Sequence, residues 1–536
     1  MALRELLLLS LCGLNAVYVC HARTVSKLSG TTFSGYNLDI GLGTPTQRLR
    51  VLVDTASTDF PIATSANSDP ASKLSTYFDT SQSSSFGNQY TPVNRFYTNT
   101  SYWRGTLGLA RVSLSTLKPV SAWMVAVYDS KNFFLPEWQG ALGLAPSVSG
   151  DLAQGGQVHQ STFSAFYDVG RVFFNKFSLQ LCGVSQQGST TTQGNLVWGN
   201  NLKSLYTGPI LYTPYVPATL YVVAVNHIAV NGVKVTATAS NDSATVTTNN
   251  TTLTAVLDSA TTGLRFPATG LYQQVVSSIR NSTMMNTDSD FRRTVALCTQ
   301  SDDFWRGSVS CCISIGTNSS ELFGGFPNIS IAIPQAVWYL AEPKEFLLTV
   351  TPQLYLVPTR VSSAPRKCYR FSISASDNDA LVFGTGLLEG YYVVFDREEK
   401  RIGFAASACP DLDPVLQKPG ILGPYLTDGV TTAVHSSVTT AAATTSKPGP
   451  TPTTNTGTVP KCALVSAELC KRSSGSESKT SGIAIGVGVS FGGLLLLATF
   501  AALLVRMKRN ADTYDLMDET EEKNIGPING GAESLA

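Results

Sequence analysis

Two stretches of this 536-residue chain share one pattern: Val51-Leu52-Val53-Asp54-Thr55-Ala56-Ser57 and Ala255-Val256-Leu257-Asp258-Ser259-Ala260-Thr261. In each, an apolar run leads to an aspartate, a hydroxyl residue, an alanine and a second hydroxyl residue. The copies lie far apart in a chain long enough for two similar lobes. If the lobes face each other, Asp54 and Asp258 meet at a pseudo-symmetry axis.

Two carboxylates at close range cannot both ionise easily, so they share a proton. One then acts as a base toward a water molecule, while the other acts as an acid toward a carbonyl oxygen. This chemistry predicts peptide hydrolysis that needs no metal and no covalent intermediate.

One such turn alone predicts only an Asx-type turn at the end of a strand. The combination is more informative, because each copy follows an apolar strand that would bury its aspartate at a cost. Each copy also has a downstream partner of the form apolar-apolar-glycine: Ala141-Leu142-Gly143 and Val382-Phe383-Gly384.

The composition favours an all-β fold and gives no sign of a nucleic-acid partner. The net charge is +1 and only 14% of the residues are charged. Short apolar, β-rich runs between turn residues predict strands at 49–53, 123–127, 221–230, 254–257, 346–350 and 391–395. The best helical pattern is 270–280.

The two ends of the chain predict passage through the secretory pathway. Residues 1–22 have the basic start and apolar core of a signal peptide. Residues 482–505 carry no charge and are long enough to span a bilayer, and Arg506, Lys508 and Arg509 follow at once. The positive-inside rule then places the tail in the cytoplasm. Seven Asn-x-Ser/Thr triplets are candidates for glycosylation: Asn99, Asn241, Asn249, Asn250, Asn281, Asn318 and Asn328.

Several further segments between residues 36 and 409 carry a family resemblance. They include Gly35-Tyr36-Asn37-Leu38-Asp39-Ile40, Phe177-Ser178-Leu179-Gln180-Leu181-Cys182-Gly183 and Gly390-Tyr391-Tyr392-Val393-Val394-Phe395-Asp396. With the two aspartate turns, they make the chain resemble the pepsin-family aspartic proteases, most closely the membrane-anchored beta-secretase branch. The resemblance implies an all-β, bilobal fold with a central cleft.

The resemblance also implies roles for the residues of the two turns. Asp54 and Asp258 would form the catalytic dyad. Thr55 and Ser259 would cross-brace the loops beneath the dyad. Ser57 and Thr261 would bind the outer carboxylate oxygens and hold them coplanar.

A hairpin flap is implied by Phe96-Tyr97-Thr98 followed by Trp103-Arg104-Gly105-Thr106-Leu107-Gly108. Tyr97 would close over the substrate, and Trp103 would bond its hydroxyl. The alternative interpretation of Tyr97 is an exposed aromatic residue on a hairpin.

Both turns depart from the family at one position, because alanines stand at 56 and 260 where the family has glycine. Alanine keeps the backbone N–H, but its methyl group would cost roughly 1–2 kcal/mol if the turn needed a positive φ. The change leaves two interpretations open. One is an active aspartic endopeptidase, and the other is a catalytically silent homologue that binds peptides as a membrane receptor.

Ten cysteines are present, and two of them lie in the predicted signal peptide. The resemblance implies two disulfides, Cys182–Cys409 and Cys298–Cys368, and leaves Cys311 and Cys312 unassigned. Cys462 and Cys470 are expected to pair near the membrane. No Cys/His cluster has metal-binding spacing, so neither a metal nor a cofactor is expected.

The predicted organisation runs from the signal peptide to a cytoplasmic tail. Its segments are a signal peptide (1–22), a short N-terminal segment (23–35), an N-terminal lobe (36–208), a C-terminal lobe (209–412), a Thr/Ser/Pro-rich stalk (413–481), a transmembrane helix (482–505) and a tail (506–536). The expected protein is a single-pass type I membrane protein of the secretory pathway, endosome or cell surface. Its ectodomain is expected to be monomeric and to act on polypeptides, membrane proteins among them.

Overall fold

The computed structural model describes most of the chain between residues 24 and 412. The described residues are 24–98, 101–146, 160–183, 193–217, 220–235, 253–268, 270–286, 295, 298–314, 323–335, 345–359, 366–377, 379–410 and 412. The predicted signal peptide, the predicted stalk from 413, the predicted transmembrane helix 482–505 and the predicted tail lie outside them. Within these ranges, no helix is long and apolar enough to cross a bilayer.

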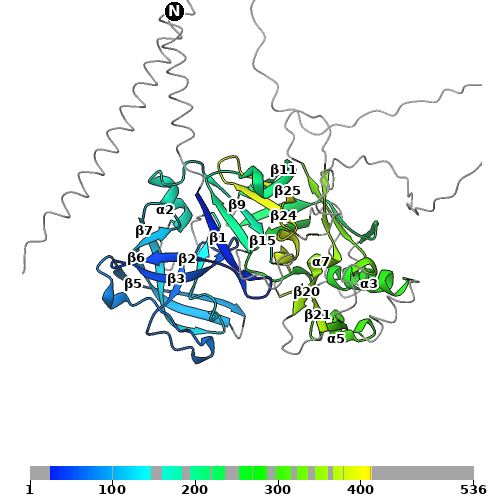
Figure 1. Ribbon diagram of the computed structural model, residues 1–536, viewed down its shortest axis with the longest axis horizontal. Coiled ribbons are helices and arrows are strands. Elements are labelled where there is room, and N and C mark those ends of the chain that lie inside the picture. Colours follow the sequence, from blue (N-terminus) through cyan, green and yellow to red (C-terminus); the bar gives the residue numbers. More distant parts are fainter. Residues whose placement is uncertain are drawn as a thin grey trace, which may run out of the picture. The chain divides into compact units, whose positions relative to one another are not determined.

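The first lobe is built almost entirely of β-strands (Figure 1). Its strands are β2 (Gly35–Leu42), β3 (Gln47–Asp54), β4 (Pro61–Ala63), β5 (Gly87–Thr98), β6 (Ser101–Leu114), β7 (Val120–Lys131) and β8 (Gly140–Gly143). Its helical segments are η1 (Pro70–Ser72), η2 (Thr80–Gln82) and α2 (Thr162–Asp168). β2 pairs antiparallel with β3, and β5, β6 and β7 form an antiparallel meander.

The second lobe is also built mainly of β-strands and has a few more helices. Its strands are β12 (Tyr221–Val225), β13 (His227–Val230), β14 (Val233–Val235), β15 (Leu253–Leu257), β16 (Leu264–Pro267), β17 (Cys311–Ser314), β18 (Ile329–Pro334), β19 (Glu345–Val350), β20 (Leu356–Thr359), β21 (Arg366–Phe371), β22 (Ile373–Ser376) and β23 (Leu381–Phe383). Its helices are α3 (Leu271–Met284), α5 (Asp302–Trp305), α7 (Pro352–Tyr355) and α8 (Thr385–Leu388). The predicted helix at 270–280 and the predicted strands are therefore confirmed, except that the run 221–230 forms two strands, β12 and β13, which are separated at Asn226.

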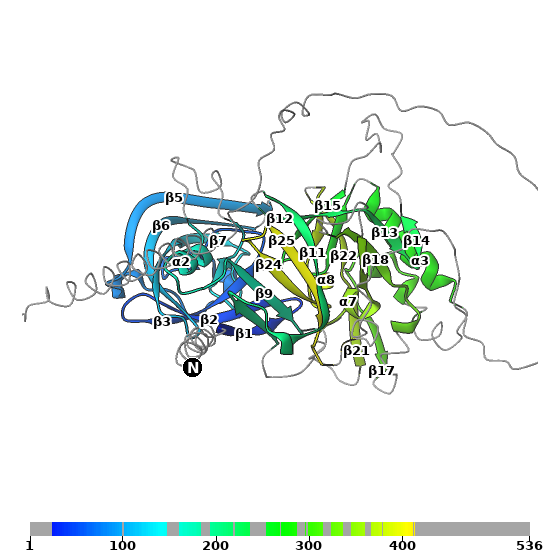
Figure 2. The ribbon, with the colours of Figure 1, turned by 90° about the horizontal axis from the view of Figure 1, so that it is seen from above.

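Six antiparallel strands join the two halves and lie between them in both views (Figures 1 and 2). In pairing order they are β1 (Thr24–Thr31), β10 (Gly194–Trp198), β9 (Lys176–Leu181), β24 (Tyr391–Asp396), β25 (Arg401–Ser407) and β11 (Tyr206–Pro217). A short η3 (Lys203–Leu205) precedes β11. Because β9 comes from the first half and β24 from the second, this sheet fixes the lobes against each other.

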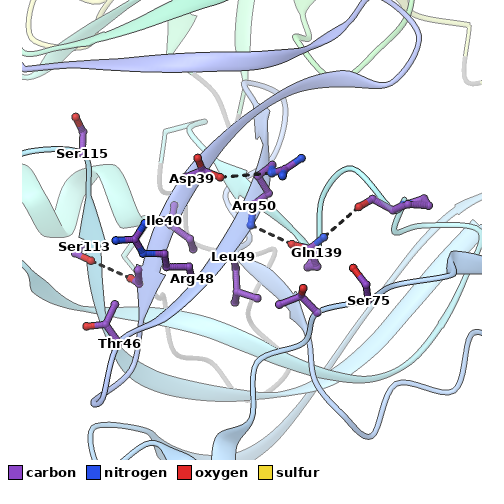
Figure 3. A pocket seen from close by; sticks show the side chains of 13 residues that line it. Asp39, Ile40, Thr46, Arg48, Leu49, Arg50, Ser75, Ser113, Ser115 and Gln139 are labelled. Atoms are coloured by element: carbon purple, nitrogen blue, oxygen red, sulfur yellow. Dashed lines mark hydrogen bonds and ion pairs between the residues drawn. The ribbon is translucent and has the colours of Figure 1, made fainter. Parts of the chain in front are cut away.

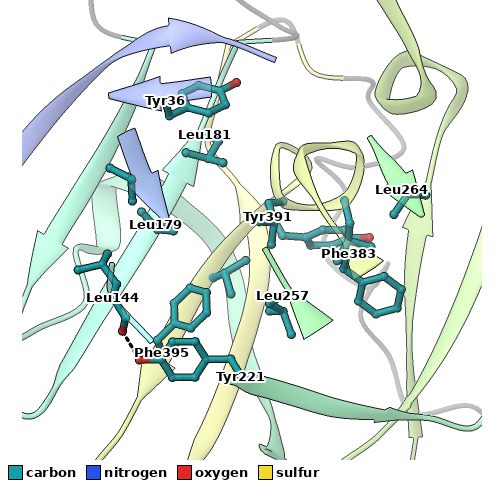
Figure 4. Close-up of a cluster of buried hydrophobic side chains, with 14 of the residues drawn as sticks. Tyr36, Leu144, Leu179, Leu181, Tyr221, Leu257, Leu264, Phe383, Tyr391 and Phe395 are labelled. Carbon is teal, nitrogen blue, oxygen red and sulfur yellow. Dashed lines mark hydrogen bonds between the residues drawn. The ribbon is translucent and has the colours of Figure 1, made fainter. Parts of the chain in front are cut away.

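An apolar core continues from this sheet into both lobes (Figure 4). Phe177 of β9 stacks on Phe395 of β24 with ring centroids 4.7 Å apart, and Tyr221 packs edge-on against Phe395 at 4.7 Å. The buried Tyr221 hydroxyl donates to the carbonyl oxygen of Leu144 at 2.8 Å. This contact connects β12 of the second lobe to the residue that follows β8 of the first. Because β12 pairs with β15 and β8 pairs with β3, it links the neighbours of the two strands that lead to the aspartates.

The disulfides correct one of the two expected pairings. Cys182 is bonded to Cys409, as expected, but Cys298 is bonded to Cys311 and Cys368 to Cys312. The expected Cys298–Cys368 bond is wrong because of strand register. Cys312 of β17 lies directly opposite Cys368 of β21, while the side chain of the adjacent Cys311 points to the other face of the strand, toward Cys298.

Candidate active site

Each aspartate turn follows a strand that is paired in parallel with a strand of its own lobe. In the first lobe β3 pairs with β8, and in the second β15 pairs with β23. The two downstream glycines have a steric reason to be glycine. A Cβ atom on Gly143 would lie 2.6 Å from the Ser57 carbonyl oxygen, and one on Gly384 would lie 2.3 Å from that of Thr261. The apolar-apolar-glycine segments therefore pack directly against the backbone of the two aspartate turns.

The two turns are tied to each other across the lobes by reciprocal hydrogen bonds. The Thr55 amide donates to Ser259 Oγ at 3.1 Å, and the Ser259 amide donates to Thr55 Oγ1 at 3.0 Å. The Thr55 hydroxyl donates in turn to the carbonyl oxygen of Leu257 at 2.9 Å, and that of Ser259 to Val53 at 2.7 Å. Both side chains are fully buried. Thr55 and Ser259 therefore form the cross-brace between the two loops that the family resemblance implies.

Both carboxylates accept the same kinds of hydrogen bond from their own turns. In the first, the Ala56 amide donates to Asp54 Oδ1 at 2.8 Å and the Ser57 hydroxyl to Oδ2 at 2.7 Å. In the second, Asp258 Oδ1 accepts from the amides of Ala260 and Thr261, at 2.8 and 3.2 Å, and Oδ2 from the Thr261 hydroxyl at 2.6 Å. The two acidic groups are therefore held in nearly equivalent settings.

The alanines fit the turns without the strain that a positive φ would bring. Neither Ala56 nor Ala260 belongs to the described non-glycine residues with positive φ. The methyl group of Ala260 also packs against an apolar cluster of the first lobe that includes Leu52, Val125 and Trp138. The alanines thus keep the amide hydrogen bonds to the carboxylates, and one of them adds a contact between the lobes.

The electrostatic setting of Asp54 is unusual for a carboxyl group. Burial, and after it the negative charge of Asp258, raise the pKa of Asp54 to about 7. The hydrogen bonds from Ser57 and Ala56 act in the opposite direction, because they stabilise the charged form. A proton is therefore retained on the pair across the mildly acidic range.

The expected flap is the hairpin of β5 and β6, and its two predicted residues are in contact. The Trp103 indole N–H donates to the Tyr97 hydroxyl at 3.1 Å. Trp103 is fully buried, whereas Tyr97 is about half exposed. The exposure applies to the residue as a whole, whereas its hydroxyl is enclosed beside the buried Trp103. This burial, and after it the charge of Asp54, raise the pKa of the Tyr97 hydroxyl, so Tyr97 lies within electrostatic reach of the dyad.

Two further features near the dyad escaped the sequence analysis. The ring of Phe133 stacks on Tyr97 with centroids 5.3 Å apart, which gives the hairpin an aromatic support. Arg95 of the hairpin forms an ion pair with Asp59, which follows the first aspartate turn. Neither pair belongs to a short motif, because its two residues lie more than 30 positions apart in the sequence.

A separate surface pocket lies on β2, β3 and β6 (Figure 3), and its lining includes neither aspartate nor the flap residues. It is polar, and its charged groups are the exposed Asp39–Arg50 ion pair at 3.4 Å and Arg48. The pocket is therefore separate from the two aspartate turns and from the hairpin.

Comparisons with known proteins agree with this geometry. The sequence model of the family described as eukaryotic aspartyl protease matches residues 35–407. The chain is 30% identical over 414 residues to a beta-secretase of Strongylocentrotus purpuratus, which covers 74% of this chain and 71% of that protein. It is 25% identical over 386 residues to gastricsin of Oryctolagus cuniculus, covering 70% of this chain and 82% of that protein. It is 22% identical over 372 residues to pepsin A of Rhinolophus ferrumequinum, covering 69% and 80%. The chain belongs to the eukaryotic aspartyl protease family.

Proposed function

We propose that this protein is a membrane-anchored aspartic endopeptidase in which Asp54 and Asp258 activate a water molecule against a peptide carbonyl. The observation that carries the proposal is the equivalent set of hydrogen bonds around the two carboxylates, joined by the reciprocal Thr55–Ser259 bonds. Preorganised donors of this kind keep both carboxylates in place without reorganisation during the reaction.

In the proposed reaction, the charged aspartate removes a proton from the water as it attacks the carbonyl carbon. The protonated aspartate donates its proton to the carbonyl oxygen, which gives a neutral tetrahedral diol. The aspartate that took the proton from water then gives it to the amide nitrogen, while the other aspartate takes a proton from a diol hydroxyl. The C–N bond breaks to give a carboxylic acid and an amine, and the dyad returns to its starting state. Tyr97, held by the hydrogen bond from the buried Trp103 to its hydroxyl, would close over the substrate and exclude water during these steps.

The alternative, a silent peptide-binding receptor, was motivated by the two alanines. Those alanines keep the amide hydrogen bonds to both carboxylates and adopt no positive φ, so the motive for the alternative is weakened. The likeness to beta-secretase supports an ectodomain in the secretory pathway, with polypeptides as the substrate class. Anchoring through residues 482–505 is part of the proposal and derives from the sequence pattern alone.

The decisive experiment is hydrolysis of a peptide library by the secreted ectodomain, with and without a statine-type inhibitor. We expect cleavage that the inhibitor blocks, and loss of cleavage in Asp54→Asn and in Asp258→Asn while both variants keep the folded circular dichroism spectrum. Near-parental activity in either variant would refute the dyad. Inhibitor binding without any hydrolysis by the parent would favour the receptor.

A further inference from the structure

An ion pair connects the hairpin to the first aspartate turn. Arg95 Nε donates to Asp59 Oδ2 at 2.8 Å, and Arg95 Nη1 donates to the carbonyl oxygen of Asn94 at 3.2 Å. The Asp59 side chain is 4% exposed and that of Arg95 is 28% exposed. A charge-assisted hydrogen bond this short and this shielded from water is stronger than an ion pair on the surface, which solvent screens.

Asp59 is fixed relative to the dyad by its backbone. The strand-end residues 143–145 donate three amide hydrogen bonds to the turn, to the carbonyl oxygens of Asp59 at 2.9 Å, Asp54 at 2.8 Å and Ser57 at 2.9 Å. These bonds hold the whole stretch from 54 to 59 as one rigid loop. The backbone of Asp59 is therefore held at a fixed place relative to Asp54, and the charge of its carboxylate reaches that of Asp54.

Arg95 is fixed in the same way relative to the flap residues. It lies directly opposite Trp103 in the pairing of β5 with β6, and Tyr97 follows two residues later in β5. Residues directly opposite each other in an antiparallel pair project their side chains to the same face, so Arg95 shares a face with Trp103. The pairing shifts register between Phe96 and Thr98, and the hydrogen bond from the Trp103 indole to the Tyr97 hydroxyl places Tyr97 at that face. The ion pair thus ties the face of the hairpin that carries Tyr97 to the loop that carries Asp54.

We propose that Arg95 and Asp59 are positioning residues for the peptide hydrolysis proposed above: the pair holds the hairpin over the dyad, and Arg95 neutralises the charge that Asp59 places beside Asp54. The proposal rests on the proposed function. It assigns a role to two residues that neither touch the scissile bond nor belong to the aspartate turns.

The charges around Asp54 support this role and fix the sign of its effect. Asp258 of the second turn and Asp59 of its own loop both raise the pKa of Asp54. On the hairpin, Asp59 raises the pKa of Tyr97 while Arg95 lowers it, so both charges act on the same small region. Removing the Asp59 charge should lower the pKa of Asp54, and removing the Arg95 charge should raise it.

The test is the pH profile of kcat/KM for Asp59→Asn, Arg95→Met and the double variant, each compared with the parent. We expect the alkaline limb of the profile to shift to lower pH in Asp59→Asn and to higher pH in Arg95→Met. Each shift should be about half a pH unit, which equals about a threefold change in rate at a fixed pH on that limb. The double variant should return close to the parental limb. KM should rise in all three variants, because the hairpin is no longer tied down.

Two comparisons separate this effect from general damage to the fold. The exposed pair Asp39–Arg50 lies in the same lobe, so Asp39→Asn and Arg50→Met should leave the profile unchanged (Figure 3). Arg95→Lys keeps the charge but not the guanidinium geometry, so its limb should match the parent while its KM rises. Arg95→Lys also provides a test if Arg95→Met fails to fold.

Shifts of both single variants in the same direction, or no shift, with hydrolysis intact would overturn the positioning role and leave the proposed function standing. If the parent binds a statine-type inhibitor but does not hydrolyse peptides, the pH dependence of inhibitor binding replaces that of kcat/KM. It should shift to lower pH in Asp59→Asn and to higher pH in Arg95→Met, and the absence of these shifts refutes the positioning role. A parent that neither hydrolyses peptides nor binds the inhibitor would refute the proposed function, and the positioning role with it.

Discussion

Thr55 and Ser259 bind each other twice, each donating its backbone amide to the side-chain oxygen of the other, at 3.1 and 3.0 Å. These bonds lie in a fully buried layer beneath the two aspartates. Because the two residues come from different lobes, the relative position of the lobes at the dyad depends directly on two hydroxyl groups.

Thr55→Val therefore should damage both stability and catalysis. The substitution keeps the shape of the side chain, but it leaves the Ser259 amide and the Leu257 carbonyl oxygen buried without these partners. We expect a loss of about 2–4 kcal/mol in the free energy of unfolding, together with a large fall in kcat. Denaturant unfolding and steady-state kinetics measure the two effects. Thr55→Ser is the control and should stay close to the parent, whereas a Thr55→Val protein with parental stability would contradict the role of the network.

The pH profile of hydrolysis should be bell-shaped with an acidic maximum. One carboxylate must be charged and the other neutral, and the pKa of Asp54, raised to about 7 by burial and by Asp258, sets the alkaline limit. Activity should therefore fall as the pH rises through about 7 and should also fall in strong acid, once both groups hold a proton. Initial rates on a fluorogenic peptide between pH 3 and pH 9 test this, and a maximum at about pH 8 or above would exclude the mechanism.

The same raised pKa predicts that the dyad costs stability at neutral pH. The folded protein holds a proton on Asp54 up to about pH 7, whereas the unfolded chain releases it near 3.8. Stability is thus highest below the unfolded pKa and is lost as the pH rises toward the folded pKa, by on the order of 4 kcal/mol. Asp54→Asn removes this loss. Its advantage in melting temperature over the parent should be larger at pH 8 than at pH 4, and an equal advantage at both would contradict the raised pKa of Asp54.

The dyad could be predicted from the sequence because its pattern is local, and the family resemblance implied its hydrogen-bond partners. An aspartate, two hydroxyls and the preceding apolar strand all lie within seven residues, and the duplication supplied the second copy. The strand positions followed for the same reason, from short apolar runs between turn residues. The Tyr97–Trp103 contact was also within reach, because both residues belong to one hairpin.

The features that the sequence did not predict depend on register and on distance along the chain. Asp59 and Arg95 come together only once the hairpin folds back over the first turn, and no spacing rule describes that contact. The φ values of Ala56 and Ala260 depend on the turn as a whole rather than on the residue type. The pairing of Cys312 with Cys368 is a consequence of which residues lie opposite each other in β17 and β21.

The corrected disulfide pattern can be tested with one cysteine substitution. Cys298→Ser should leave Cys311 as a free thiol, because these two residues are bonded, and should leave Cys368 bonded to Cys312. Alkylation under non-reducing conditions, followed by peptide mapping with fragmentation between Cys311 and Cys312, identifies the labelled residue. Label on Cys368 would restore the pairing that the family resemblance implied. Cys182→Ser is the control and should free only Cys409.

The last prediction concerns the two alanines that set this chain apart from its family. If their methyl groups strained the turns by roughly 1–2 kcal/mol, replacing both with glycine would raise kcat/KM by roughly five- to thirty-fold. The turns adopt no positive φ at these positions, and each alanine amide already donates to its carboxylate at 2.8 Å. We therefore expect Ala56→Gly with Ala260→Gly to leave kcat/KM within about twofold and to lower the free energy of unfolding by about 1–2 kcal/mol.

The single variants sharpen this test, because the two methyl groups have different surroundings. Only the methyl of Ala260 packs against the apolar cluster of the opposite lobe, so Ala260→Gly should account for the larger share of the lost stability. Thermal melts and peptide kinetics on the two single variants and the double variant separate the two quantities. A rise in kcat/KM, with unchanged cleavage sites, would mean that the alanines restrain the carboxylates after all. Unchanged kinetics with a lower melting temperature would mean that the chain accommodates alanine where its relatives use glycine, and gains a contact between its lobes.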